Sequence, residues 1–234
     1  MEPLQRIRLT YSQGEELRQS TQRDLAALWA QACAASGIVL AHNEDRRPEG
    51  RIAFAARLPA GATSDREFAD IETAVHVCDD DLILLLPPHL PPGLRLLAAR
   101  EVGRHGPAIS TLARWSEYLV EAPDRREEAA VRKAIEGLLS AETLPWEQAH
   151  EKRVSRYDLR PLVMDLALEE AREGAYVLRM RLRHTNERAG RPEQVTLALG
   201  FSEAPTRLHR TQVYLSRLPE AIQRQREQGD ESGW

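Results

Sequence analysis

The order of the expected secondary-structure elements constrains this chain more than any single motif does. Apolar and polar residues alternate over residues 6–12, which predicts a strand with one buried face. Thr21 and Asp24 then have the spacing of a helix capping box, an apolar stripe follows, and Gly37 stands where a helix ends. A strand followed by a helix is therefore expected at the start of the chain.

Further strands and a short helix complete the first half. Residues 52–58 and 68–75 read as two strands that a long turn at residues 59–67 joins into a hairpin. A short helix with an acidic start must end at Pro87, and residues 94–102 read as a closing strand. The order βαββαβ suits an antiparallel sheet with both helices on one face, the ferredoxin-like arrangement.

The second half repeats this order by pattern rather than by residue identity. The elements expected there are a strand at residues 115–122, a helix at 126–141, strands at 162–170 and 175–185, a helix at 191–200 and a strand at 209–216. The fold class predicted is α+β, with two tandem ferredoxin-like (βαββαβ) modules that have antiparallel sheets. Their expected bounds are residues 1–110 and 111–217, and the polar tail 218–234 is expected to be disordered.

Composition and charge exclude several classes of function. Hydrophobic residues make up 42% of the 234 residues and charged residues 29%, which is typical of a folded, soluble protein. The net charge of −4 gives no global basic field, so any polyanion site must be a local patch. Two cysteines and scattered histidines form no recognisable metal motif, so neither a metal nor a cofactor is expected. Without a signal peptide or an apolar run long enough for a membrane span, the expected location is cytoplasmic, with no membrane partner.

The clearest candidate site is a row of arginines on an expected strand. Arg179, Arg181 and Arg183 alternate with apolar residues, so one sheet face would carry three guanidinium groups. In a ferredoxin-like module this face is free of helices, and RNA-recognition modules bind bases on such a face. The alternative is a solvated face on which Glu169 and Glu170 of the partner strand balance the arginines.

Two charged segments, one in each half, precede the expected hairpins. Their candidate nucleic-acid-binding residues are Arg156, Tyr157 and Arg160 in the second half, and Arg46, Arg47 and Arg51 in the first. Arginine and tyrosine together suit single-stranded nucleic acid, because they supply ion pairs and stacking. In the alternative interpretation Tyr157 packs on the sheet edge, Asp158 caps the chain or pairs with Arg160, and the rest is solvated.

Catalytic patterns are poor. The sequence has no His-x-x-x-His pair, no Gly-x-Ser-x-Gly elbow and no glycine-rich phosphate loop. An acid–base pair for RNA cleavage, His42 with Asp45 or His184 with Tyr157, would require folding to bring the two side chains together. The sequence therefore favours a protein that is not an enzyme, and no catalytic residue is assigned.

Five segments in combination resemble a known family. They are "RIRLTYSQGEELR", "RIAFAARLPAGATSDREFADIE", "PPGLRLLAAREV", "YDLRPLVMDLAL" and "RPEQVTLALG". This combination is similar to the radical-SAM-linked protein family, a domain of unknown function fused to or encoded beside radical SAM enzymes of the B12-binding-like class. The resemblance implies an accessory role beside a radical SAM protein, and it supplies no catalytic residues. The chain departs from the family pattern at Gln22, where the family has a histidine, and in residues 42–51, where only Pro48 and Arg51 of the usual loop remain.

Three functions are consistent with these observations. The first is a non-catalytic accessory protein of a radical SAM enzyme that binds RNA, or an RNA-containing assembly, through the arginine-rich sheet face. The second is a protein–protein docking module for the same partner that handles no nucleic acid and exposes an apolar patch. The third is a metal-independent ribonuclease on a tandem ferredoxin-like scaffold, an analogy that rests on fold alone.

Overall fold

The computed structural model describes residues 3–42, 51–150, 153–185 and 187–216. Within these residues the chain is α+β, with ten strands and four α-helices, and most strand pairs are antiparallel. The chain divides into two compact units. The first comprises Met1–Ala60, Asp65–Ala113 and Leu215–Trp234, and the second comprises Gly61–Ser64 and Arg114–Tyr214.

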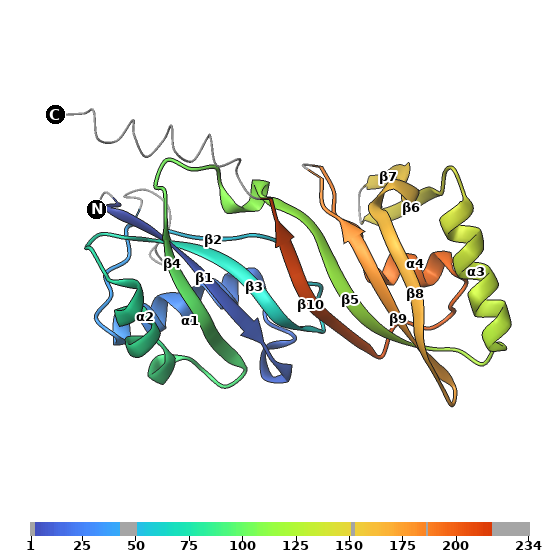
Figure 1. Cartoon of the computed structure of the whole chain (residues 1–234), viewed down its shortest axis with the longest axis horizontal. Helices are drawn as coiled ribbons and strands as arrows, with labels where there is room; N and C mark the ends of the chain where they lie inside the picture. The colour runs from blue at the N-terminus through green and yellow to red at the C-terminus, as the bar shows by residue number, and fades with distance from the viewer. Residues whose placement is uncertain (1–2, 43–50, 151–152, 186, 217–234) are drawn as a thin grey trace. The chain divides into compact units, whose positions relative to one another are not determined.

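The first unit contains a sheet in the order β4-β1-β3, with β2 paired to β3 (Figure 1). Its strands are β1 (Gln5–Gln13), β2 (Ile52–Phe54), β3 (Ala62–Thr73) and β4 (Leu94–Val102), and its α-helices are α1 (Gln22–Ala35) and α2 (Asp79–Leu85). The 3-10 helices η1 (Glu15–Leu17), η2 (Pro87–His89) and η3 (Ile109–Thr111) lie in its connections. The first three residues of β3 are counted with the second unit.

Local sequence explains why α1 begins and ends where it does. The Thr21 side chain accepts a hydrogen bond from the Asp24 backbone N–H at 3.2 Å, and the Asp24 carboxylate accepts one from the Thr21 backbone at 2.8 Å. This confirms the capping box. Gly37 has a φ of 78°, a left-handed conformation that glycine adopts without strain, and it lies just beyond the helix end.

The core of the first unit lies on one face of its sheet. Ile7, Leu9 and Tyr11 of β1 are buried there against Trp29 of α1 and Leu82 of α2. Because side chains alternate along a strand, the intervening residues of β1 lie on the opposite face. The sheet therefore has a face covered by helices and a second, polar face.

The second unit contains a sheet in the order β10-β5-β9-β8, and β10 also pairs in parallel with the first residues of β3 (Figure 1). Its strands and helices are β5 (Ala113–Pro123), α3 (Glu128–Ser140), β8 (Val163–Arg172), β9 (Ala175–Arg183), α4 (Pro192–Ala198) and β10 (Arg207–Leu215). A separate two-stranded sheet is formed by β6 (Pro145–His150) and β7 (Arg153–Asp158), and the 3-10 helix η4 (Arg160–Leu162) follows it. Pro192 stands at the start of α4 and Gly200, with a φ of 84°, just beyond its end, as the sequence predicts.

Two expectations about the hairpins are wrong in detail. The predicted long turn at residues 59–67 is mostly strand, because β3 begins at Ala62, and β2 ends at Phe54 rather than at residue 58. Residues 62–64 carry no strong strand pattern of their own and extend because β10, far away in the sequence, pairs with them. The segment interpreted as a basic connection in the second half instead contains β7, which pairs with β6 from Pro145 to His150.

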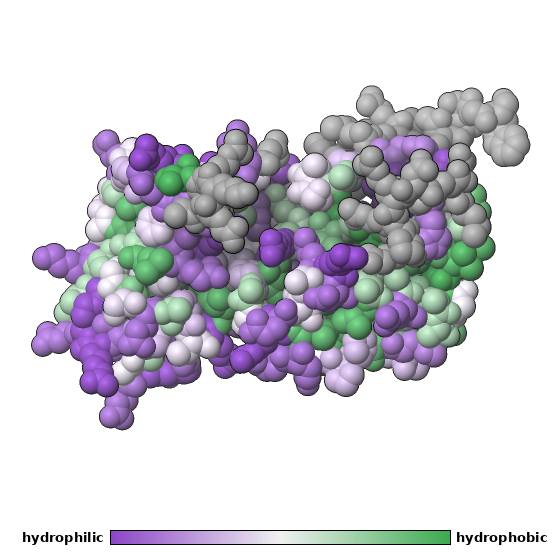
Figure 2. Space-filling view, turned by 180° about the vertical axis from the view of Figure 1, so that it is seen from behind, coloured by the Kyte–Doolittle hydropathy of each residue, from purple (hydrophilic) through white to green (hydrophobic). Residues whose placement is uncertain are grey.

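None of the helices in the described part of the chain is both long and apolar enough to cross a membrane. Seen from behind, the surface is mostly hydrophilic, with smaller hydrophobic areas between the hydrophilic residues (Figure 2). The described residues form an α+β structure, whereas two tandem ferredoxin-like modules remain a prediction.

Candidate nucleic-acid interface

The predicted arginine row lies on β9, on the face of the second unit's sheet opposite its buried side chains. Arg179, Arg181 and Arg183 are half-buried or exposed, whereas Met180 and Leu182 between them are fully buried. On the neighbouring strand β5, the residues that register with the row are Leu119, Glu117 and Trp115, in that order.

Acidic residues of neighbouring strands pair with most of this row. Arg179 donates to Glu169 at 2.7 Å and to Asp165 at 2.8 Å, and these hydrogen bonds raise the pKa of Arg179 above its ordinary value. Arg181 donates to Glu117 of β5 at 2.8 Å. The acids that pair with the row therefore come from both sides, rather than only from the expected partner strand.

Arg183, at the end of the row, has no acidic partner among the described residues. Arg183 donates to the backbone carbonyl of Pro161 at 3.2 Å. Glu170, expected to balance the row, pairs instead with Arg172 at 2.7 Å.

An aromatic pair lies on the same face and was missed by the sequence reasoning. The rings of Trp115 on β5 and Tyr214 on β10 are stacked, with centroids 5.1 Å apart and planes 7° from parallel. The guanidinium of Arg181 lies 5.5 Å from the centroid of the Trp115 ring. Tyr214 is 46% exposed, so the stack reaches solvent. Both rings occupy polar-face positions of their strands, and that signal could have identified them.

The second predicted segment, Arg156, Tyr157 and Arg160, makes contacts with other parts of the second unit. Arg156 pairs with Glu147 across the β6–β7 hairpin at 2.5 Å. The Tyr157 hydroxyl donates to the Gln194 side chain of α4 at 2.8 Å, and the Arg188 guanidinium lies 4.2 Å from the Tyr157 ring centroid. Tyr157 therefore attaches the hairpin to α4.

Arg160 satisfies backbone carbonyls. It donates to those of Leu139 and Ala141 at the end of α3, and to that of Val163. The backbone N–H of Arg160 also donates to the Asp158 carboxylate at 2.9 Å. These contacts give Arg160 a structural role at the C-terminal end of α3.

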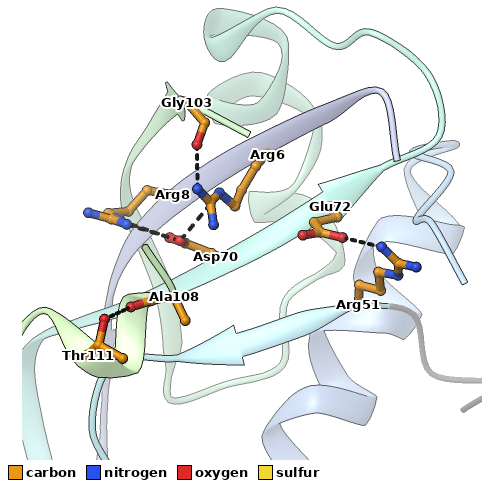
Figure 3. Close-up of polar contacts among 8 residues, drawn as sticks. All are labelled: Arg6, Arg8, Arg51, Asp70, Glu72, Gly103, Ala108 and Thr111. Carbon is orange, nitrogen blue, oxygen red and sulfur yellow. Dashed lines mark hydrogen bonds and ion pairs between the residues drawn. The ribbon is translucent and has the colours of Figure 1, made fainter. Parts of the chain in front are cut away.

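The first unit presents a second group of arginines on the polar face of its sheet (Figure 3). Arg8 donates to both oxygens of Asp70, at 2.8 and 3.0 Å, and the Arg6 Nε lies 4.0 Å from the same carboxylate. The Arg6 Nη2 also donates to the backbone carbonyl of Gly103. Asp70 is 3% exposed, so two arginines share one buried carboxylate.

Only one residue of the predicted first-half segment can be placed. Arg51 pairs with Glu72 at 3.0 Å (Figure 3), whereas Arg46 and Arg47 lie outside the described residues. Sequence reasoning noted Arg6 and Arg8 only as the polar side of a strand. The alternation that defines that strand was the available signal for them.

The arrangement gives no described acid–base pair for cleavage of RNA. The Nε2 of His184 shares a hydrogen bond with the Ser116 hydroxyl at 2.7 Å, and Tyr157 bonds to Gln194 instead. Burial lowers the pKa of His184 to about 4, and the positive charge of Arg210 acts in the same direction. Asp45 of the other predicted pair lies outside the described residues.

Among the described residues, no group of three or more His, Cys, Asp or Glu side chains could hold a metal ion.

Comparisons with known proteins give little functional guidance. No curated protein matches the chain. Solved structures that resemble it include a Cbf5–Nop10–Gar1 complex (9% identity, TM-score 0.48) and an archaeal box H/ACA sRNP Nop10–Cbf5 complex (10% identity, TM-score 0.45). A third is an H/ACA RNP bound to a substrate RNA (10% identity, TM-score 0.44).

Each of these likenesses covers 89% of this chain but only about half of the other, at 50%, 49% and 49%. With TM-scores below 0.5 they carry no functional argument.

The family match covers most of the chain. Residues 6–192 match the family described as "Uncharacterized protein conserved in bacteria". Nothing in this match links the family to radical SAM enzymes, so the partner implied by the sequence resemblance is unsupported. A match of this extent shows that the chain belongs to DUF2344, a family of uncharacterized bacterial proteins.

Proposed function

We propose that the chain binds single-stranded RNA on the polar face of its second unit's sheet. The observation that carries the proposal is the stack of half-buried Trp115 on exposed Tyr214, with Arg181 beside the Trp115 ring. Sheet faces that bind single-stranded RNA use aromatic rings and guanidinium planes in this way, because every base has a face that can stack.

The ion pairs on this face determine which arginines of the row are available to bind RNA. Arg179 is held by two carboxylates and is the least available of the row. Arg181 pairs with one carboxylate and already lies over a ring, and Arg183 has only a backbone carbonyl among its described partners. Because paired guanidiniums give little net attraction for phosphate, we expect stacking to dominate binding at this face and the salt dependence of its contribution to be small.

The strand order supports a ferredoxin-like origin of both units. Counted along the chain, the strands of the first unit lie in the order fourth, first, third, second. The order β10-β5-β9-β8 in the second unit is the same once the β6–β7 hairpin is set aside. In each unit a helix follows the first and the third strand. We therefore infer two ferredoxin-like modules, the second carrying the hairpin as an insertion.

The test is a binding titration with ring variants. We expect a fluorescent oligouridylate to bind the full chain, and Trp115→Ala with Tyr214→Ala to weaken binding by about 1–3 kcal/mol if the ring pair stacks one base. The matched control is Trp115→Phe with Tyr214→Phe, which keeps two rings and should retain most of the affinity. Equal affinity of the alanine and phenylalanine variants would overturn the proposal.

A second function, protein docking, has one observation in its favour. Three consecutive apolar residues of α2 face solvent: Ile83 (39% exposed), Leu84 (72%) and Leu85 (45%). An apolar group of this kind is typical of a surface that another protein covers. A partner that co-purifies after nuclease treatment, and is lost with Leu84→Asp, would favour docking over RNA binding.

A further inference from the structure

We infer that the polar face of the first unit's sheet, along β1 and β4, binds the phosphate groups of a polynucleotide. This inference deepens the proposed function and rests on it only for the identity of the ligand. The site consists of Arg8 on β1 with Arg95 and Arg100 on β4, and nothing in the family description assigns it a role.

The register of β1 with β4 places these arginines on one face. Arg100 lies directly opposite Arg8, and Arg95 lies opposite Ser12. Ile7, Leu9 and Tyr11 occupy the buried face of β1, so Arg8 and Ser12 and their partners lie on the other. Strand geometry separates Arg95 from Arg100 by roughly 15 Å along β4, which leaves room for two or three successive phosphates.

On this face the arginines outnumber the carboxylates that pair with them in the described residues. Arg95 and Arg100 are exposed, and neither side chain makes a hydrogen bond or ion pair within the described part of the chain. Asp70 is a single carboxylate shared by Arg6 and Arg8. Glu72, another acid of β3, is paired with Arg51 (Figure 3).

Arg8 and Arg100 place two like charges opposite each other, and Asp70 compensates only that of Arg8. Like charges opposite each other in an antiparallel pair are destabilising. A local rule broken in this way is typical of functional positions, where a ligand supplies the missing interaction. An anion between the two guanidiniums would turn the repulsion into attraction for both.

The contacts of Arg8 also hold it ready for such a ligand. Its Nε and Nη2 are occupied by the Asp70 oxygens at 2.8 and 3.0 Å, which fixes the guanidinium plane. The Nη1 donates in no hydrogen bond within the described residues and remains for a phosphate. Between the arginines Thr10 lies opposite Ala98, and the register shift between Thr10 and Tyr11 leaves Leu97, which is 44% exposed, without a partner residue.

Buried Arg6 strengthens the field of this face. It is 8% exposed, its Nε has no hydrogen-bond partner in the described structure, and the turn that begins at Gly103 covers it. Gly106 lies so close that a Cβ there would come within 2.8 Å of the Arg6 Nη2. A buried positive charge with partial compensation acts over a longer distance than an exposed one, because solvent screens it less.

The test compares two charge-matched double variants of the full chain. Arg95→Gln with Arg100→Gln removes two exposed charges from the proposed site. The control, Arg18→Gln with Arg23→Gln, also removes two positive charges. Arg18 lies at the end of η1 and Arg23 lies in α1, the helix that packs on the opposite face of the sheet. Each variant is titrated with oligouridylate and with inorganic polyphosphate over a range of salt concentrations.

We expect only the Arg95/Arg100 variant to bind both probes more weakly, by roughly tenfold or more at 0.1 M salt. For oligouridylate the slope of log K against log salt should fall by about 1.4, or about 0.7 for each lost phosphate contact. The same loss in the Arg18/Arg23 variant would overturn the inference, as would unchanged binding in the Arg95/Arg100 variant. Increased aggregation alone would identify the two arginines as guards of an edge strand and would also overturn it.

The two probes separate this inference from the proposed function. Trp115→Ala with Tyr214→Ala should weaken oligouridylate binding and leave polyphosphate binding unchanged, since polyphosphate has no bases. If the wild-type chain binds polyphosphate through Arg95 and Arg100, and the bases of oligouridylate add no affinity, the inference of a phosphate-binding surface stands and the RNA proposal is rejected. A wild-type chain that binds neither probe would reject both.

Discussion

Asp70 is the residue on which the buried charge of the first unit depends. It is 3% exposed, accepts two hydrogen bonds from Arg8 and lies 4.0 Å from the Nε of Arg6. Two arginines in the same sheet face would repel each other without it. Its carboxylate therefore has a structural role as well as a role in orienting Arg8.

Replacing Asp70 with asparagine should destabilise the protein strongly. The change leaves buried guanidiniums without a counter-charge, and removing one partner of a buried ion pair costs about 3–5 kcal/mol. Urea unfolding measures the loss. The matched variant is Glu72→Gln, whose pair with Arg51 is partly exposed and should contribute about 1 kcal/mol or less. Equal losses in the two variants would contradict the account.

His184 makes the stability of the second unit depend on pH. Burial and the Arg210 charge lower the pKa of His184 from 6.5 to about 4 in the folded chain. Between these values the unfolded state binds a proton that the folded state does not, so the stabilising effect of a neutral His184 is lost as pH falls from 6.5 to 4. A shift of this size corresponds to about 3 kcal/mol at most.

The measurement is the free energy of unfolding at a series of pH values. His184→Gln should flatten the decline between pH 6.5 and pH 4, because its amide does not titrate and can still bond to Ser116. His76 is exposed, and His76→Gln should leave the pH dependence as in the wild type. A profile that His184→Gln leaves unchanged would show that another group titrates in this range.

The β6–β7 hairpin is the element that sequence patterns described least well. Its polar, charged residues hide the strand pattern, because the hairpin forms a separate two-stranded sheet. The hairpin is attached to α4 by the hydrogen bond between Tyr157 and Gln194, two residues that are 37 positions apart in the sequence. Such a contact depends on the fold and cannot be deduced from local sequence.

Tyr157→Phe should loosen this hairpin without unfolding the chain. The substitution removes the hydroxyl that donates to Gln194 and keeps the ring under Arg188, so the expected loss is about 1 kcal/mol. Amide hydrogen exchange in β6 and β7 should become faster, while exchange in β9 stays unchanged. Ser155→Ala, in the same strand, is the control and should have little effect.

Elements with their own start and stop signals were predicted well from sequence. The capping box of α1, the end of α2 before Pro87 and the bounds of β4 agree with expectation. The start of β3 was missed because its pairing partner β10 lies far along the chain. The arginine row lies on β9, and Glu169 on β8 pairs with it as the alternative interpretation expected. The pairs with Asp165 and Glu117 depend on strand register, which the sequence does not reveal.

Because the whole molecule has a net charge of −4, binding of a polyanion depends on the local arrangement of its charged side chains. On the second unit's polar face the carboxylates neutralise most of the arginine row, and an aromatic stack reaches solvent. On the first unit's polar face, Arg95 and Arg100 have no described acidic partner. We therefore expect base stacking and phosphate binding to be divided between the two units.

The central claim is that RNA bases stack on Trp115 and Tyr214. The most direct measurement is photocrosslinking of the wild-type chain to an oligonucleotide that contains 4-thiouridine, followed by mass spectrometry of the crosslinked peptides. The account predicts crosslinks at Trp115 and Tyr214 that unlabelled oligouridylate competes away. Crosslinks confined to other segments, with these two residues unmodified, would contradict it.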